Sequence, residues 1–362
     1  DANRYRYKGR WRDAKEIIEP ITVKGRTTPH RERVIVTHHG PIISDAVGVN
    51  DQKVALCSMA LRPGRSFEGW RLLNLAQDWN DFVAAMAHID NTQLNISYAD
   101  VDGNIGHWVT GKLPVRAQGD GGTPLPGWTG TNEWQAEVPF EAMPHTLNPQ
   151  SGYVVSCNHR LMPDDAPYFL GNAWMNGYRA RRVETLLIKH KKISLETCHT
   201  MMMDVFCLPG IAFVSKLKKM ITSDFTDAMD ATIQSAWQKM LKWDGRLTAD
   251  SIGGTIYEVT RSFLVRNLLQ PGLGDVLTER LMGRGFHPLL LSSNEFYGYD
   301  TVTLLRLLDT PESWWVQQAG GLEVVLSQSL KQAVNWLKHT LGADIHAWQW
   351  GNLHQVTLAH SL

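Results

Sequence analysis

The sequence lacks several features that would place it in a specialised class of protein. Only four cysteines occur in 362 residues, without a Cys-x-x-Cys pair, so neither a disulfide framework nor a zinc motif is indicated and we expect reduced, mostly buried thiols. No apolar run reaches membrane-spanning length. Basic and acidic residues balance at 36 each, which argues against a nucleic-acid or anionic-membrane binder. Hydrophobic residues make up 43% of the sequence, which is enough to bury a substantial core in one large domain or two ordinary ones.

The most distinctive chemistry lies between Asn148 and Arg182. Within this stretch an apolar run, residues 153–155, predicts a short buried strand that ends on Ser-Cys-Asn-His at 156–159. Polar side chains at a strand end lie at the rim of a sheet, where functional sites are common. The amide of Asn158 is suited to stabilise an oxyanion, and Arg179 at a helix start is suited to fix that amide or a substrate carboxylate. Spacing alone favours a turn asparagine at 158 and a solvated or structurally paired helix-start arginine at 179.

Several motifs resemble, in order, the β chain of the penicillin acylase family. They read NxSYADVDGNIGHWVTGKLPVR, PLPGWTG, EW, VPFEAMPHTLNPQSGYVV and YRARRVETLL, and the resemblance extends from about Arg10 to the final residues. The family comprises amidases of the N-terminal-nucleophile type, including penicillin, cephalosporin and acyl-homoserine-lactone acylases. The resemblance implies an α+β fold, part of an αββα sandwich with an attached helical region. We expect residues 1–182 to be mainly β and to carry the oxyanion-side residues, and residues 183–362 to be mainly helical.

The resemblance implies hydrolysis of a linear amide through an acyl-enzyme intermediate. The family nucleophile is the first residue of the β chain, freed by self-cleavage of a precursor, and its α-amino group acts as the base. Asp1 cannot replace that residue, and the segment around it resembles a stretch well inside the β chain. We therefore expect the nucleophile, the α chain and the rest of the β chain to be partners outside this sequence, and this chain alone to be inactive. The substrate implied is a small acyl-amide, and family members are often exported.

Position by position, Asn158 matches the family's oxyanion asparagine and Arg179 the arginine that supports it. Ser156 departs from the family, which usually has an asparagine or another small polar residue there. Catalysis in the family requires no cofactor, but a structural calcium is common. Its nearest counterparts here are Asp165 and the backbone near Gly121, while Tyr168 stands about where a carboxylate is expected.

The rest of the chain reads as scaffold. Adjacent histidines His38 and His39 follow an apolar strand, and on a strand they would point to opposite faces, so at most one would join a given site. Asp-Gly at 102–103 between alternating runs predicts a hairpin. Residues 54–61 read as a strand and residues 68–87 as one or two helices. Helical periods follow at 183–191, 194–203, 210–221, 228–241, 251–269, 302–308 and 321–341.

Two other functions remain open at this stage. A non-catalytic module would use the fourteen tryptophans to stack on sugars or peptides, although such residues within apolar helical patterns are mostly core, so we expect most to be buried. A metal-dependent hydrolase would use histidines such as His346, His354 and His360, whose spacing matches no His-Glu-x-x-His motif.

Overall fold

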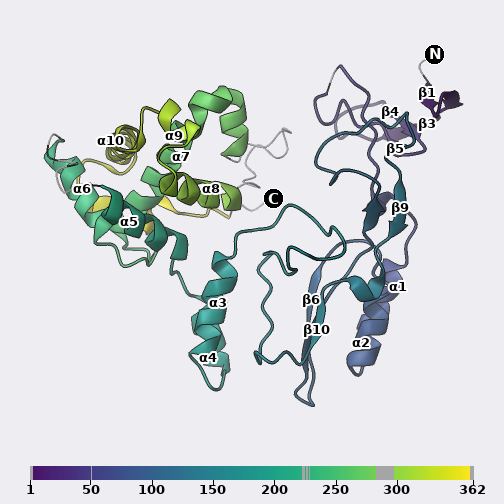
Figure 1. Cartoon of the computed structure of the whole chain (residues 1–362), viewed down its shortest axis with the longest axis horizontal. Helices are drawn as coiled ribbons and strands as arrows, with labels where there is room; N and C mark the ends of the chain where they lie inside the picture. Colours follow the sequence, from purple (N-terminus) through teal and green to yellow (C-terminus); the bar gives the residue numbers. More distant parts are fainter. Residues whose placement is uncertain are drawn as a thin grey trace. The chain divides into compact units, whose positions relative to one another are not determined.

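The chain folds into two compact units, residues 1–174 and 175–362. The computed structural model describes residues 3–49, 51–221, 225, 227, 229–282 and 297–358. The first unit holds the described strands and two helices, and the second is built of helices (Figure 1). This content agrees with the predicted α+β class. The division by function expected at residue 182 stays a prediction.

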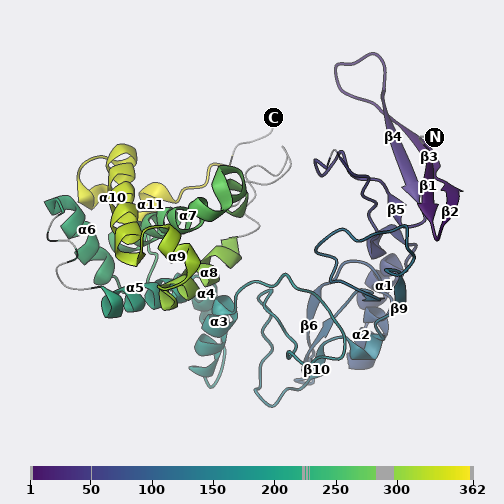
Figure 2. The same ribbon diagram turned by 45° about the horizontal axis from the view of Figure 1, so that its top comes forward.

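Two small sheets begin the first unit. β1 (Arg4–Tyr7) pairs with β2 (Arg10–Asp13), and β3 (Lys15–Ile21) pairs with β4 (His30–Thr37), which also pairs with β5 (Gly40–Pro41). All these pairings are antiparallel, and Figure 2 shows the four longer strands grouped near the N-terminus. Most side chains of β2 and β3 are exposed.

A third sheet in the order β10-β7-β6 forms the centre of the first unit's core. β6 (Asn95–Ala99) and β7 (Ile105–Val109) make the predicted hairpin around Asp102-Gly103, and β10 (His145–Leu147) pairs with the other edge of β7. The helices α1 (Ser66–Leu73) and α2 (Trp79–Met86) lie beside this sheet in Figure 2. Phe82, Met86 and Trp108 are almost fully buried where α2 meets β7. These contacts hold β10 and the residues that follow it.

The remaining elements of the first unit are short. β8 (Pro114–Arg116) pairs with β9 (Trp134–Glu137), and η1 (Met59–Leu61) and η2 (Phe140–Ala142) are single 3₁₀ turns. Between β8 and β9 lies the predicted glycine- and proline-rich loop, residues 119–130, which has no regular structure. The loop is tied to the first hairpin, because the Lys8 amide donates to the Trp128 carbonyl at 2.8 Å.

Each predicted helical run after residue 182 overlaps one observed helix with shifted ends, whereas the short helices at 314–318, 345–347 and 350–353 were not predicted. The second unit consists of these helices. They are α3 (Tyr178–Ile188), α4 (Leu195–Met202), α5 (Leu208–Met220), α6 (Ala231–Leu241), α7 (Ile252–Leu281), α8 (Tyr297–Asp309), α9 (Trp314–Gln318), α10 (Leu322–Leu341), η4 (Ile345–Ala347) and α11 (Trp350–Leu353). Helix caps explain several starts, since Ser194 accepts a hydrogen bond from the Thr197 amide and Asp230 accepts two at the start of α6. α7 is interrupted at Gly274, where φ is +71°.

Leucines dominate the core of the helical unit. Leu264 and Leu268 of α7 and Leu326 and Leu330 of α10 are fully buried. The stripe follows helical spacing, which is why this half of the fold was predictable from periodicity.

Two predicted strands are absent. Residues 153–155, before Asn158, form no strand, and residues 54–61 give only a bridge between Ile42 and Ala55 followed by η1. In the second case the Ser58 hydroxyl accepts a hydrogen bond from the Ala60 amide and so favours a turn. An apolar run becomes a strand only where another strand pairs with it, and neither run has a paired strand in the described part of the chain.

Two burial expectations were also wrong. Cys57 and Cys198 are exposed, and the other two cysteines are partly buried. Of the fourteen tryptophans, the buried ones are Trp108, Trp237, Trp243 and Trp348, whereas the exposed ones are Trp11, Trp70, Trp128, Trp314 and Trp336. The exposed rings are spread over both units and come from separate elements.

Candidate functional site

The stretch that carries the predicted oxyanion asparagine is anchored at its start by Asn148. This residue has a left-handed backbone, with φ +48°. Its side-chain oxygen accepts from the Ile105 amide at 3.0 Å, and its amide nitrogen donates to the Asn104 side chain at 2.8 Å. The chain leaving β10 is thereby fastened to the β6–β7 hairpin, which is itself part of the buried sheet.

Asn158 also has a left-handed backbone, with φ +58°, and its side chain is exposed. Left-handed backbone costs most residues energy and is tolerated best by glycine, asparagine and aspartate, and it recurs where a loop presents a functional group. Next to it, the Cys157 amide lies 3.4 Å from Nδ1 of His159. Asn158 therefore lies on an exposed tight bend.

The loop after Asn158 is tied to the glycine-rich loop. The Asn172 amide donates to the Asp120 carboxylate at 2.6 Å, and a backbone hydrogen bond from Gly122 together with this contact lowers the pKa of Asp120. Arg160 pairs with Asp164 and donates to the Pro163 carbonyl at 3.1 Å. The loop after Asn158 and the glycine-rich loop, which are far apart in sequence, are thus joined within one unit.

Arg179 lies in the first turn of α3, as predicted, and is exposed. A different arginine of the same helix is fixed: Arg182 binds the Asp204 carboxylate through two contacts, of 2.7 and 2.8 Å, and lies 4.5 Å from the Phe206 ring centre. The hydrogen bonds from Arg182 lower the pKa of Asp204 despite its burial. Sequence reasoning missed this pair because the two residues are separated by a helix and a turn.

The predicted pairing of Asn158 with Arg179 spans the two units. Asn158 belongs to the first unit and Arg179 to the second. Their joint role in one site therefore stays a prediction that rests on the family resemblance.

The calcium site expected near Asp165 stays a prediction. Asp165 is exposed, and among the residues that the structure describes it belongs to no group of three histidine, cysteine or carboxylate side chains that share one centre. Calcium takes 6–8 oxygen ligands. The resemblance implies that catalysis itself requires no such ion.

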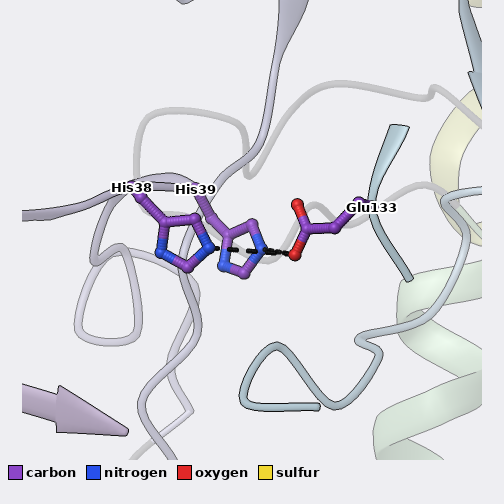
Figure 3. A group of neighbouring side chains, drawn as sticks. All are labelled: His38, His39 and Glu133. Carbon is purple, nitrogen blue, oxygen red and sulfur yellow. Dashed lines mark hydrogen bonds and ion pairs between the residues drawn. The ribbon is translucent and has the colours of Figure 1, made fainter. Parts of the chain in front are cut away.

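The structure instead brings together His38, His39 and Glu133. Thr37 pairs with Gly40, so the two histidines form a hairpin turn instead of continuing a strand, and both rings face the same carboxylate (Figure 3). The prediction that at most one of them could join a site was therefore wrong. Gly40 is required after them, because a Cβ there would lie 2.1 Å from the Leu56 carbonyl oxygen.

The electrostatics of this cluster follow from its partial burial. Burial and the neighbouring His39 lower the pKa of His38. For Glu133, burial alone would raise the pKa, but the hydrogen bond from His39 and the nearby histidines lower it overall. Both lowered pKa values favour the deprotonated form, an ionised carboxylate at Glu133 and a neutral imidazole at His38.

The histidines near the C-terminus form no such cluster. His346 and His354 belong to no metal-competent group in the described part of the chain, and His360 lies outside the described residues. Across the helices that the structure describes, none combines the length and apolar character needed to cross a membrane.

The sequence model of the family described as penicillin amidase matches residues 1–362. The chain belongs to the penicillin amidase family. Among relatives, acyl-homoserine lactone acylase QuiP of Pseudomonas fluorescens is 28% identical over 367 residues, which cover 97% of this chain and 44% of that protein. The penicillin acylase 2 proenzyme of a Pseudomonas species is 26% identical over 245 residues, covering 64% of this chain and 30% of that one. The chain thus spans less than half the length of these relatives.

The fold agrees with the family. Thermostable penicillin G acylase from Alcaligenes faecalis superimposes with a TM-score of 0.69 and 20% identity, covering 96% of this chain and 65% of that one. The α+β fold of the N-terminal-nucleophile type that the motifs predicted is confirmed.

Proposed function

We propose that this chain supplies the oxyanion side of an amidohydrolase that cleaves an acyl group from an amine. Two observations support the proposal: the penicillin amidase family model matches the chain end to end, and Asn158, which the motifs match to the family's oxyanion asparagine, lies on an exposed left-handed bend. A side-chain amide there is a donor that a tetrahedral intermediate can use. The bend fixes the backbone of Asn158, so little rearrangement is needed when charge develops.

The mechanism has two steps. A nucleophile from polypeptide outside these 362 residues attacks the amide carbonyl while its own α-amino group accepts the hydroxyl proton. The tetrahedral intermediate collapses, the protonated amine leaves and an ester-linked acyl-enzyme remains. Water then attacks the ester and releases the acid. Asn158 donates to the oxyanion in both steps, and Arg179 orients that asparagine.

The partners follow from the same proposal. The α chain and the remainder of the β chain complete the enzyme, and all arise from one precursor, as the word proenzyme implies for the related penicillin acylase 2. A structural calcium, where it binds, takes Asp165 as one ligand and the rest from the completing polypeptide.

The activity is tested with the complete gene product. Because the relatives are named for acyl-homoserine lactones and penicillins, these two amides are assayed first, by measuring release of the free amine. We expect hydrolysis of at least one, with an acyl adduct of the nucleophile visible by mass spectrometry after rapid quenching. Failure to cleave any linear amide would contradict the proposed reaction.

The 362-residue chain alone is assayed beside it. We expect no hydrolysis, because the attacking residue lies elsewhere. Turnover by this chain alone that persists after further purification would overturn the assignment of the nucleophile to other polypeptide.

A further inference from the structure

The hairpin turn between β4 and β5 places two imidazoles and a carboxylate around one point. Nε2 of His39 lies 2.9 Å from Oε1 of Glu133, and Nε2 of His38 lies 3.8 Å from the same oxygen. The three ligand atoms all lie within 4.8 Å of one another, and Figure 3 shows the two rings side by side with the carboxylate at their edge. Two ligand atoms bound about 2.1 Å from a tetrahedral metal stand roughly 3.4 Å apart. The observed separations bracket that value.

The outer nitrogen of His38 is already engaged. Its Nδ1 lies 3.1 Å from the Tyr5 hydroxyl, which also accepts from the His38 backbone amide at 3.2 Å. The ring stacks on Tyr5 and meets the edge of Tyr7 at 4.2 Å between centres. Histidines that bind metals are typically held in this way through the nitrogen that does not face the ion. The arrangement leaves Nε2 of His38 directed at Glu133.

The side chains of the cluster are partly buried and still reach solvent. The side chains of His38, His39 and Glu133 are 25, 20 and 36% exposed. Two imidazole nitrogens and one carboxylate form a donor set that zinc accepts together with a water molecule, whereas calcium prefers oxygen ligands only.

We propose that His38, His39 and Glu133 bind one divalent transition-metal ion, zinc foremost, with a water molecule as the fourth ligand. The ion would join the β4–β5 turn to the chain entering β9. It would therefore hold one end of the glycine-rich loop, since Gly127 packs so closely on His39 that a Cβ there would lie 3.2 Å from its Cε1. The site lies apart from Asn158 in sequence and does not depend on the proposed reaction.

The test measures zinc binding by the complete gene product after chelator treatment, by titration with Zn²⁺ alone and by the absorption spectrum with Co²⁺. We expect one zinc ion to bind at the cluster, and we expect the Co²⁺-loaded protein to show the absorption spectrum of tetrahedral cobalt. His38→Phe is the decisive variant: it keeps an aromatic ring beside Tyr5 and Tyr7 and leaves the His39–Glu133 hydrogen bond in place. We expect it to weaken zinc binding at least about 10–100-fold while the circular dichroism spectrum is unchanged.

Glu133→Gln and a matched control complete the test. Glu133→Gln should weaken binding to a similar degree. Glu32→Gln is the control, because Glu32 makes the same 2.9 Å contact with His30 but no second histidine joins that pair. Zinc should also raise the melting temperature of the wild type and of Glu32→Gln but not that of His38→Phe. Equal zinc affinity in His38→Phe and wild type, or no zinc binding by the wild type, would overturn the site. The cluster would then be only a hydrogen-bonded contact between the β4–β5 turn and Glu133.

Discussion

At the scale of single residues, the local sequence identifies chemistry less well than it identifies conformation. Spacing predicts only a turn asparagine at Asn158, and the predicted oxyanion role comes from the family resemblance alone. The structure adds that the backbone of Asn158 is left-handed. His38 and His39 were misplaced because the usual Asn-Gly or Asp-Gly signal of a two-residue turn is missing and the glycine comes one position later. Glu133 stood in a quoted motif, but nothing local linked it to residues 94 positions away.

The Arg182–Asp204 pair gives a stability prediction at this scale. Both side chains are mostly buried, at 19 and 12% exposed, and two contacts join them. Asp204→Asn should lower the free energy of unfolding at pH 7 by roughly 2–3 kcal/mol, somewhat less than for a fully buried pair because part of Arg182 meets solvent. Urea unfolding of wild type and variant measures the difference. An unchanged unfolding midpoint would show that the pair is not formed.

The same pair predicts a pH dependence. The pKa of Asp204 is lower in the folded protein than in the unfolded chain, chiefly because of the hydrogen bonds from Arg182. Its stabilisation is therefore complete above the unfolded pKa and is lost as the pH falls through the folded value. The difference between wild type and Asp204→Asn should be constant between pH 6 and about 5 and shrink below about pH 4. A difference that stays the same down to pH 3 would contradict the lowered pKa.

At the scale of elements, periodicity and turn chemistry located the longer helices and the β6–β7 hairpin, but not the short helices α9 and α11. Asp-Gly at the hairpin turn and the leucine stripes of α7 and α10 are local signals, and the structure follows them. The strand predicted at 153–155 does not form, because a strand needs a neighbouring strand to pair with and the local sequence does not specify one.

The packing of α2 on the central sheet can be tested at Gly106. A Cβ at this position of β7 would lie 2.3 Å from the Trp79 ring and 3.0 Å from the Thr146 carbonyl oxygen of β10. Gly106→Ala should therefore cost about 1–3 kcal/mol, as overpacking in a core does. Gly177→Ala is the control, since nothing lies within 4 Å of its Cβ position. Equal melting temperatures for the two variants would contradict the close approach of Trp79.

At the scale of the whole molecule, the family accounts for what the local signals do not. The family model matches the whole chain and the fold is shared with a penicillin G acylase, while the chain covers 44% of the QuiP relative. Arg179 lies in the second unit and Asn158 in the first, so the role proposed for Arg179 requires both units in the complete enzyme. Arg179→Ala in the complete enzyme should reduce kcat, whereas Arg181→Ala, its exposed neighbour on α3, should not. Equal losses in both variants would remove Arg179 from the site.

The central claim is that the amide of Asn158 stabilises the oxyanion, and Asn158→Gly in the complete enzyme tests it most directly. Glycine keeps the left-handed backbone and removes only the amide, so kcat should fall about 10²–10³-fold with the melting temperature unchanged. Asn148→Gly, at the other left-handed asparagine of this stretch, should instead lower the melting temperature and leave kcat of the folded enzyme intact. A wild-type kcat for Asn158→Gly would contradict the account.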